Sequence, residues 1–416
     1  MLNLLKINKN FLKNQHLNFY ENKKINKIKK SIEKENLVTI TWLYTINKTA
    51  YINETINRFF TKNKIFYFNK NLDFFNKIKN KKNLVELIKE FSIENNTPQI
   101  IILEECDKVE DIKIFIKDFY KKWYKIIIIW NNIEVSSKPE IEIFPLKFKN
   151  YKKYFKEKIS LDNLLVFGDN EEQIRLTDKK IKLNILENQK NSILLKDIYE
   201  KFSIKNTTWF ENLIIFLSIL NKSISIREIY SQIKKENKIS LVTINDYLDY
   251  ATKSKLIKKI FPYDFKKQKE INSKAKYYFT NLWIRNSLNY FSTSKNEAIK
   301  NLIFLELLKN SYKINSWINW KFSFSFFAKK LKEEKNEIKS KILYIHLSEA
   351  KDKKELKKEI NKLNKVPYFP TISKEKNISE KIEKFLIVEN IEDLKIKKLK
   401  YDQTEIIELK NFLKKI

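Results

Sequence analysis

The chain has 416 residues, enough for two to four domains with their own cores, and its 43% hydrophobic and 14% aromatic content indicates a folded protein. A single cysteine, Cys106, excludes a disulfide framework and a cysteine zinc cluster, and two distant histidines, His16 and His346, argue against a histidine-rich metal site. The net charge of 84 − 51 = +33 is compatible with a nucleic-acid partner, but lysine is abundant everywhere and arginine is scarce, so the charge is weak evidence for one.

The chain shows no signal for a membrane. Its first residues lack the continuous apolar core of a signal peptide, and its longest apolar runs, such as residues 213–220, are too short to span a bilayer. We therefore expect a soluble cytoplasmic protein without a membrane partner. The single glycine is the most unusual feature of the composition, because average usage is roughly 7%.

Apolar strands alternate with amphipathic helices over residues 1–150. This pattern predicts an α/β domain in which helices cover both faces of a parallel sheet and ligands bind at the carboxyl ends of the strands. The predicted strands are 37–41, 65–68, 99–103, 125–129 and 141–144, and the predicted helices are 11–20, 24–35, 48–60, 82–91 and 112–120.

Residues 42–49 have the spacing of a phosphate-binding P-loop, G-x-x-x-x-G-K-[ST]. Trp42 and Asn47 occupy the two glycine positions, and Lys48 and Thr49 fill the last two. Lys48 is predicted to contact the β and γ phosphates of ATP, and Thr49 to bind Mg²⁺. Asparagine tolerates the left-handed backbone that this glycine adopts, whereas the bulk of Trp42 is harder to accommodate.

Polar residues also follow two later strands of the predicted sheet. Glu104 is predicted to bind Mg²⁺, Glu105 to polarise the attacking water, and Asn131 (or its neighbour Asn132) to sense the γ-phosphate. Taken alone, a Lys-Thr pair after a strand is common, and an acidic pair is more often a solvated loop. The order of the three sets along the chain favours a P-loop fold.

The remaining chain is predicted to form three further segments. Residues 151–205 are a helical lid or connector, with the only glycine, Gly168, in a turn. Residues 206–290 have the helix–helix–helix–ribbon outline of a winged helix-turn-helix, with helices 209–220, 226–235 and 242–251 and strands 256–261 and 276–280. Residues 291–416 mix helices 297–309 and 353–363 and a short C-terminal helix with strands near 322–327, 342–347 and 384–388.

The order of these motifs resembles the AAA-type P-loop ATPases of the prokaryotic "archaeal ATPase" group, which join a P-loop core to a winged helix and a C-terminal nuclease-like domain. The resemblance covers nearly the whole chain, although each motif is degraded. The matching segments are 42–49, Glu104-Glu105 with Lys108, Trp130-Asn131, 145–151, 243–248 with 256–257, and 278–286.

The C-terminal segment resembles the restriction-endonuclease-like fold without its catalytic carboxylates. The three nuclease motifs of the family correspond to residues 300–303, 323–326 and 345–348. No carboxylate remains there to hold the metal that phosphodiester cleavage requires, so nuclease activity is not expected.

Three of the seven tryptophans, Trp42, Trp130 and Trp283, align with family glycines, and Trp123 precedes a strand where a turn favours glycine. One hypothesis explains both these tryptophans and the scarcity of glycine: the codons are UGA, in an organism that reads UGA as glycine. The alternative is a paralogue with degraded motifs.

The resemblance implies an ATP-binding protein whose nucleotide state, through ATP hydrolysis or switching, repositions a winged helix. The alternative is a catalytically dead relative that acts as a DNA-binding or protein-interaction scaffold. Lysines at 253, 255, 258 and 259 provide contacts for DNA phosphates, but Asp246 opposes them. Winged helices of this family often bind proteins, so the winged helix leaves both a DNA and a protein partner open.

Overall fold

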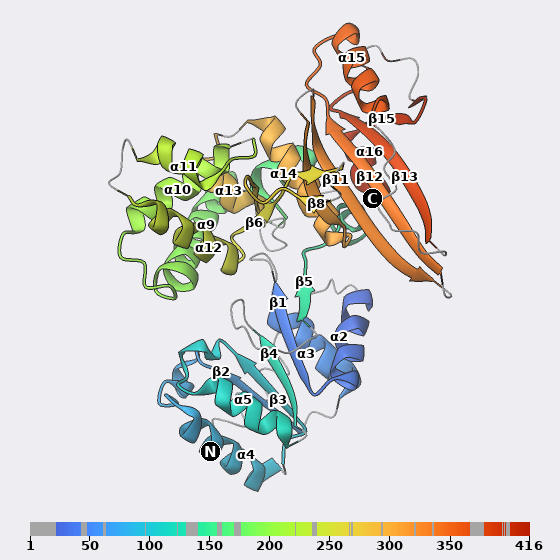
Figure 1. The fold of residues 1–416 in the computed structure, drawn as a ribbon. Coiled ribbons are helices and arrows are strands. Elements are labelled where there is room, and N and C mark those ends of the chain that lie inside the picture. The colour runs from blue at the N-terminus through green and yellow to red at the C-terminus, as the bar shows by residue number, and fades with distance from the viewer. Residues whose placement is uncertain are drawn as a thin grey trace. The chain divides into compact units, whose positions relative to one another are not determined.

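The protein is described here from a computed structural model (Figure 1). Contacts between residues divide the chain into two compact units, Met1–Pro145 and Leu146–Ile416. The predicted subdivision at residues 150, 205 and 290 remains a prediction. The structure describes residues 22–42, 48–60, 64–95, 97–122, 124–129, 140–155, 160–169, 176–220, 222–234, 239–265, 267, 269–292, 294–319, 322–334, 337–366, 378–392, 394, 396 and 400–416.

The N-terminal unit is built on a five-stranded, wholly parallel sheet with strand order β2-β3-β4-β1-β5. Its strands are β1 (Leu37–Trp42), β2 (Ile65–Asn69), β3 (Ile100–Glu104), β4 (Lys125–Ile129) and β5 (Glu140–Ile143). Its helices are α2 (Asn22–Lys34), α3 (Lys48–Phe59), α4 (Lys81–Asn95) and α5 (Ile112–Lys121), with short 3₁₀ turns at Asp73–Phe75 and Cys106–Lys108.

Burial explains why these segments form a parallel sheet. All five residues of β3 and the last four of β4 are buried, as expected for strands covered on both faces. Helix α2 packs on α3 and β1, while α4 packs on α5 and α5 on β4. The predicted α/β core with a parallel sheet is confirmed, and its strands lie within two residues of their predicted bounds. The predicted helix at 11–20 lies outside the described residues.

The C-terminal unit begins with helices. These are α6 (Phe148–Phe155), α7 (Leu161–Phe167), α9 (Lys179–Ser192) with a π-helical continuation at Ile193–Tyr199, α10 (Thr207–Ile219), α11 (Ile226–Ile233) and α12 (Leu241–Lys253). Side chains cap their amino ends: Asn206 caps α10, Ser225 forms a capping box with Glu228 on α11, and Ser240 caps α12.

An antiparallel ribbon follows these helices. Strand β6 (Ile257–Ile260) pairs with β9 (Lys276–Phe279), and a small hairpin, β7 (Tyr263–Asp264) with β8 (Lys269–Glu270), lies between them in sequence. Helix α13 (Leu282–Ser287) comes next. The order of three helices and a ribbon in this region follows the sequence pattern.

The last part of the unit is a six-stranded mixed sheet with strand order β10-β11-β12-β13-β15-β14. Its elements are α14 (Lys295–Lys309), β10 (Lys313–Asn319), β11 (Phe322–Glu334), β12 (Glu337–Leu347), α15 (Lys353–Asn364), β13 (Ile378–Val388), β14 (Lys400–Tyr401), β15 (Thr404–Glu408) and α16 (Leu409–Lys415). The sequence pattern did not indicate α13 or the strands β7, β8, β10, β14 and β15.

The small hairpin and this sheet share an aromatic core. Phe265, from the loop of the small hairpin, has its ring centroid 4.1 Å from Trp317 on β10 and 4.8 Å from Phe327 on β11. Tyr263 stacks on Phe327 at 5.3 Å. The hairpin is therefore held to the C-terminal sheet by buried aromatic contacts.

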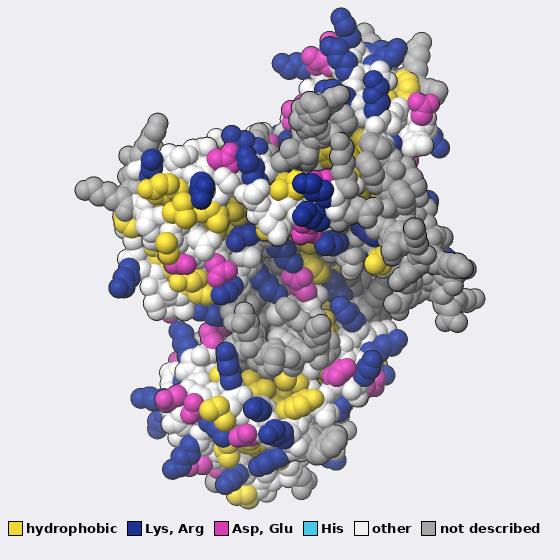
Figure 2. Space-filling model, in the orientation of Figure 1, with side chains coloured by type: hydrophobic (Ala, Val, Ile, Leu, Met, Phe, Trp, Pro, Cys, Tyr) yellow, Lys and Arg dark blue, Asp and Glu magenta, His cyan; other side chains and the backbone are white. Residues whose placement is uncertain are grey.

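Within the described residues, no helix is long and apolar enough to cross a membrane. On the face drawn in Figure 2, the Lys and Arg side chains are spread over the coloured residues with Asp and Glu among them, rather than gathered in one patch. On this face, the basic side chains therefore give no stronger evidence for a nucleic-acid partner than the net charge alone does.

Candidate functional site

The strands β1, β3 and β4, which the predicted nucleotide-site residues follow in sequence, end at the same edge of the parallel sheet. Helix α3 begins at Lys48, and five residues separate it from Trp42, where β1 ends. On the neighbouring strands, Glu104 of β3 lies opposite Ile129 of β4, and Ile129 lies opposite Ile40 of β1. Glu104 is thus two strand spacings, roughly 10 Å, from β1. Because all of these strands are parallel, the segments after β1, β3 and β4 leave the sheet at the same edge.

The structure describes only some of the predicted site residues. The backbones of Trp42, Lys48 and Thr49 are placed at the end of β1 and the start of α3, but their side chains lie outside what is described. Asn47 and Asn131 lie outside the described residues altogether. Glu104 and Glu105 are described in full.

Glu104 is a buried carboxylate held by a tyrosine of the neighbouring strand. Its side chain is 3% exposed, and the Tyr67 hydroxyl donates a hydrogen bond of 2.6 Å to its Oε2. Asn69 donates in turn to the Tyr67 hydroxyl at 3.1 Å. Burial, followed by the charge of Glu104, raises the pKa of Tyr67, so the tyrosine remains a neutral donor.

Glu105 lies at a sharp turn that immediately follows the strand. It has φ = 51°, in the left-handed region, and its backbone N–H still bonds to the Ile129 carbonyl at 3.4 Å. Cys106 follows, buried, and its thiol donates to the Glu104 carbonyl at 3.2 Å; burial raises the pKa of this thiol. The turn therefore directs the two adjacent carboxylates differently: Glu104 is buried, while Glu105 is half-buried.

The charge at the amino end of α3 is compatible with a phosphate ligand. Helix α3 has 12 residues, and its first turn carries no acidic side chain that would oppose an anion at the positive end of the helix dipole. Beside it, Lys24 of α2 donates to the Phe144 carbonyl at 2.6 Å, just after β5, and lies 5.4 Å from the Tyr51 ring. In the described part of the chain, no group of three or more His, Cys, Asp or Glu side chains is arranged to hold a metal ion.

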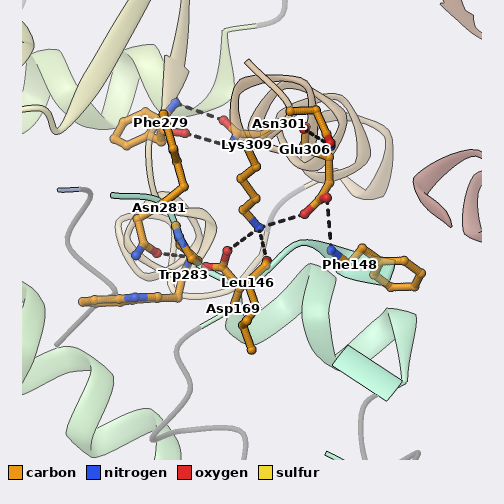
Figure 3. Close-up of polar contacts among 12 residues, drawn as sticks. Leu146, Phe148, Asp169, Phe279, Asn281, Trp283, Asn301, Glu306 and Lys309 are labelled. Carbon is orange, nitrogen blue, oxygen red and sulfur yellow. Dashed lines mark hydrogen bonds and ion pairs between the residues drawn. The ribbon is translucent and has the colours of Figure 1, made fainter. Parts of the chain in front are cut away.

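A second cluster of buried polar groups lies in the C-terminal unit, and we call it the Lys309 junction (Figure 3). The Lys309 ammonium is 2.8 Å from Asp169 and 2.8 Å from Glu306, and it donates to the Leu146 carbonyl at 3.0 Å. Glu306 also accepts the Phe148 backbone N–H at 3.1 Å. The three charged side chains are each at most 5% exposed.

The neighbouring asparagines tie together the same part of the unit. Asn301 pairs with the Phe279 backbone, accepting its N–H at 3.0 Å and donating to its carbonyl at 2.9 Å. Asn281 caps α13 by accepting the Trp283 N–H at 3.0 Å. Asn286 donates to the Leu165 and Val166 carbonyls at 2.7 and 2.9 Å.

These contacts assign a structural role to several motif residues. The segments 145–151, 278–286 and 300–303, which carry the sequence resemblance, meet around the Lys309 junction through Phe148, Phe279, Asn281, Asn286 and Asn301. Sequence reasoning missed the three charged residues of the junction. The available signal was the i, i+3 spacing of Glu306 and Lys309 on the otherwise apolar second half of α14.

Comparison with known proteins gives partial matches. Residues 161–295 match the family described as "Domain of unknown function (DUF8612)". An uncharacterized protein of Methanocaldococcus jannaschii, MJ1544, is 27% identical over 256 residues, which is 55% of this chain and 57% of the relative. An uncharacterized protein of Haemophilus influenzae is 25% identical over 187 residues, 42% of this chain and 46% of the relative. The chain spans about half the length of the curated relatives it matches.

Solved structures also show likenesses at low identity. The Walker-type ATPase PABY2304 of Pyrococcus abyssi matches with a TM-score of 0.47 and 11% identity, over 65% of this chain and 96% of that chain. The replication initiator DnaA bound to AMPPCP and single-stranded DNA matches with a TM-score of 0.25 and 14% identity, over 53% of this chain and 86% of that chain.

Proposed function

We propose that the N-terminal unit binds ATP with Mg²⁺. The observation that carries this proposal is the position of Lys48 at the start of α3, the helix that follows β1, together with Glu104 at the end of β3 and Glu105 next to it; β3 is separated from β1 by β4. Lys48 would hold the β and γ phosphates, and Thr49 and Glu104 would hold Mg²⁺. Bound Mg²⁺ would neutralise phosphate charge.

Residues for hydrolysis follow from the same arrangement. Glu105 would accept a proton from the attacking water, and Asn131 would contact the γ-phosphate. The hydrogen bond from Tyr67 fixes one oxygen of Glu104 and limits how far its longer side chain can move toward a metal. We therefore propose nucleotide binding as the activity and ATP hydrolysis as its extension.

The test is an equilibrium titration of the full chain with Mg-ATP. Wild type should bind ATP, and Lys48→Ala should weaken binding at least tenfold, because a phosphate-contacting ammonium is lost. Lys89→Ala, which removes an exposed lysine of α4, is the matched control and should bind like wild type. Absence of binding by wild type up to millimolar Mg-ATP would end the proposal.

The family assignment to the "archaeal ATPase" group is part of the proposal. The order α10, α11, α12, β6, β9 supports a winged helix, and we propose that its position responds to nucleotide. One residue from each segment that aligns with a nuclease motif lines the same pocket: Lys300 of α14, Ser325 of β11 and His346 of β12. This convergence supports a nuclease-like fold whose catalytic carboxylates have been replaced.

A scaffold role is the second candidate, and the exposed face of α12 favours a protein over DNA as its partner. Leu241 and Val242 are 39% and 67% exposed at the amino end of this helix. Asp249 is paired with Lys253 at 2.9 Å, which removes one lysine from phosphate contact. A DNA affinity that falls steeply with salt and does not depend on ATP would instead favour the DNA-binding scaffold.

A further inference from the structure

The C-terminal unit contains a polar pocket of about 400 Å³, a volume within the range of small-ligand sites. It lies where the ribbon strand β9, helix α14 and strands β10, β11 and β12 meet. Three lysines line it: Lys222 before α11, Lys276 on β9 and Lys300 on α14. All of these elements belong to the same compact unit.

Lys276 is the most informative residue of the pocket. It is 8% exposed, and within the described residues its ammonium has neither an ion pair nor a hydrogen-bond acceptor. The Lys276 ammonium lies over the Tyr278 ring, 5.4 Å from the ring centroid. Burial, and then the charge of Lys300, lowers the pKa of Lys276 to about 8. A buried ammonium without an anion is costly, so a bound anion would remove a real energetic penalty.

The other charges leave the pocket cationic. Lys300 is paired with Glu297 and with Glu349, each at 3.0 Å, and Glu349 also lines the pocket. Three ammonium groups therefore face two carboxylates, which leaves a formal charge of 3 − 2 = +1. Glu349 is 59% exposed, so it can turn toward solvent when another anion pairs with Lys300.

Neutral donors complete the lining. The Ser325 hydroxyl accepts the Leu347 N–H at 3.0 Å, which leaves its own hydrogen to donate. The hydroxyls of Ser223 and Ser316 lie 3.4 Å apart at the wall of the pocket. Ammonium groups and hydroxyls around one cavity are the donors that phosphate oxygens accept from.

We propose that this pocket binds a phosphate monoester, held by Lys276 and Lys300 with the Ser325 hydroxyl as an additional donor. Such a group is carried either by a small phosphorylated compound or by the 5′ end of a nucleic acid. The pocket is separate from the proposed ATP site in sequence and in unit, so the proposal stands without the proposed function.

The test measures protection of Lys276 itself in the full-length protein. Trace acetylation at pH 8, read by peptide mass spectrometry, should label Lys276 readily, because part of it is uncharged at that pH. Inorganic phosphate or pyrophosphate should slow the labelling at least fivefold. Labelling at Lys381, which is 74% exposed on β13, is the control and should not change. The experiment is repeated with Lys48→Ala, so that phosphate bound at the proposed ATP site cannot account for slower labelling of Lys276.

Calorimetry with Lys276→Met and Lys381→Met provides the second measurement. Lys276→Met should weaken pyrophosphate binding at least tenfold in the Lys48→Ala background, and Lys381→Met should leave it unchanged. Tighter binding of a 5′-phosphorylated than of a 5′-hydroxyl oligodeoxynucleotide, lost in Lys276→Met, identifies nucleic-acid ends as the source. Protection by small phosphates alone identifies a free compound. If none of these probes protects Lys276 in wild type, the proposal is wrong, whatever the folding of the variants.

Discussion

Gly168, the only glycine of the chain, lies against the backbone of Trp283. A Cβ atom built on Gly168 would be 3.0 Å from the Trp283 nitrogen and 3.3 Å from the Trp283 Cβ. Gly168 closes α7 with φ = 69° and ψ = −162°, a conformation that is essentially restricted to glycine. Two independent constraints, backbone conformation and close approach, therefore require glycine at this position.

Replacing Gly168 with alanine should destabilise the protein. The strained conformation costs of order 1–3 kcal/mol, and the contact with a backbone atom adds to it because backbone cannot move aside cheaply. We expect the free energy of unfolding in urea to fall by about 2 kcal/mol or more. Lys180→Ala, at an exposed position of α9, should change it by less than about 0.5 kcal/mol. Equal stability of the Gly168→Ala variant and wild type would show that this position does not require glycine.

Trp283 itself bears on the genetic code of the source organism. It is fully buried, and its indole N–H has no hydrogen-bond partner among the described residues, although it aligns with a glycine of the resembled family. If UGA is read as glycine, peptides of the natively produced protein should carry glycine at Trp42, Trp130 and Trp283. Mass spectrometry of those peptides decides the question, and tryptophan at all three would refute recoding.

The sequence predicted the elements of the N-terminal unit well because its strands are continuous apolar runs with clear boundaries. Strand β10 was missed because its sequence, KINSWIN, breaks the polar–apolar alternation at Asn315-Ser316, where its pairing with β11 shifts register, and no turn signal precedes β11. Strand β15 is only five residues long. The order of polar residues along the chain indicated the sheet edge, since parallel strands end together.

Contacts between residues far apart in sequence could not be predicted from such local patterns. The bond from Tyr67 to Glu104 depends on the register of β2 against β3, which pairs Asn69 with Glu104. The Lys309 junction joins residues 146, 169 and 306, and the pocket around Lys276 joins a ribbon, a helix and a sheet. Such sites depend on packing between segments that no local pattern specifies.

Tyr67→Phe should weaken the N-terminal unit. The substitution removes the hydroxyl that donates to the buried Glu104 carboxylate and leaves the ring in place. Losing a hydrogen bond to a buried charged group costs about 1.5–3 kcal/mol, and denaturant unfolding should report a loss of that size. Tyr120→Phe, at a site 48% exposed on α5, is the matched control and should be nearly neutral. If both variants lost equally little stability, the hydrogen bond from Tyr67 to Glu104 would contribute nothing to the free energy of unfolding.

Lys309→Met should be among the most damaging single substitutions in the C-terminal unit. It leaves Asp169 and Glu306 buried without their cation, and breaking a buried ion pair from one side costs about 3–5 kcal/mol. Lys295→Met on the same helix removes an exposed pair with Glu389 and should cost less than about 1 kcal/mol. Thermal and denaturant unfolding of the two variants make the comparison. Similar losses would mean that burial of the junction does not matter.

The lowered pKa of Lys276 predicts how stability depends on pH. Between pH 8 and 10.5, folded Lys276 has lost its proton while the unfolded chain still binds it, so stability rises with pH across this window. A pKa of about 8 against the ordinary 10.5 corresponds to about 3 kcal/mol in total. Burial is the main cause, Lys300 repels the charge, and Glu297 and Glu349 partly offset both effects.

Other lysines and the tyrosines also titrate in this window, so the quantity to measure is a difference. Wild type and Lys276→Met are unfolded in urea at pH 7.5 and at half-unit steps up to pH 10. The free energy of unfolding of wild type, minus that of the variant, should increase with pH, because the variant lacks the titrating group. At low pH the variant should equal or exceed wild type in stability, since it buries no unpaired charge. A difference that stays constant with pH would show that Lys276 keeps its ordinary pKa and is not an isolated buried cation.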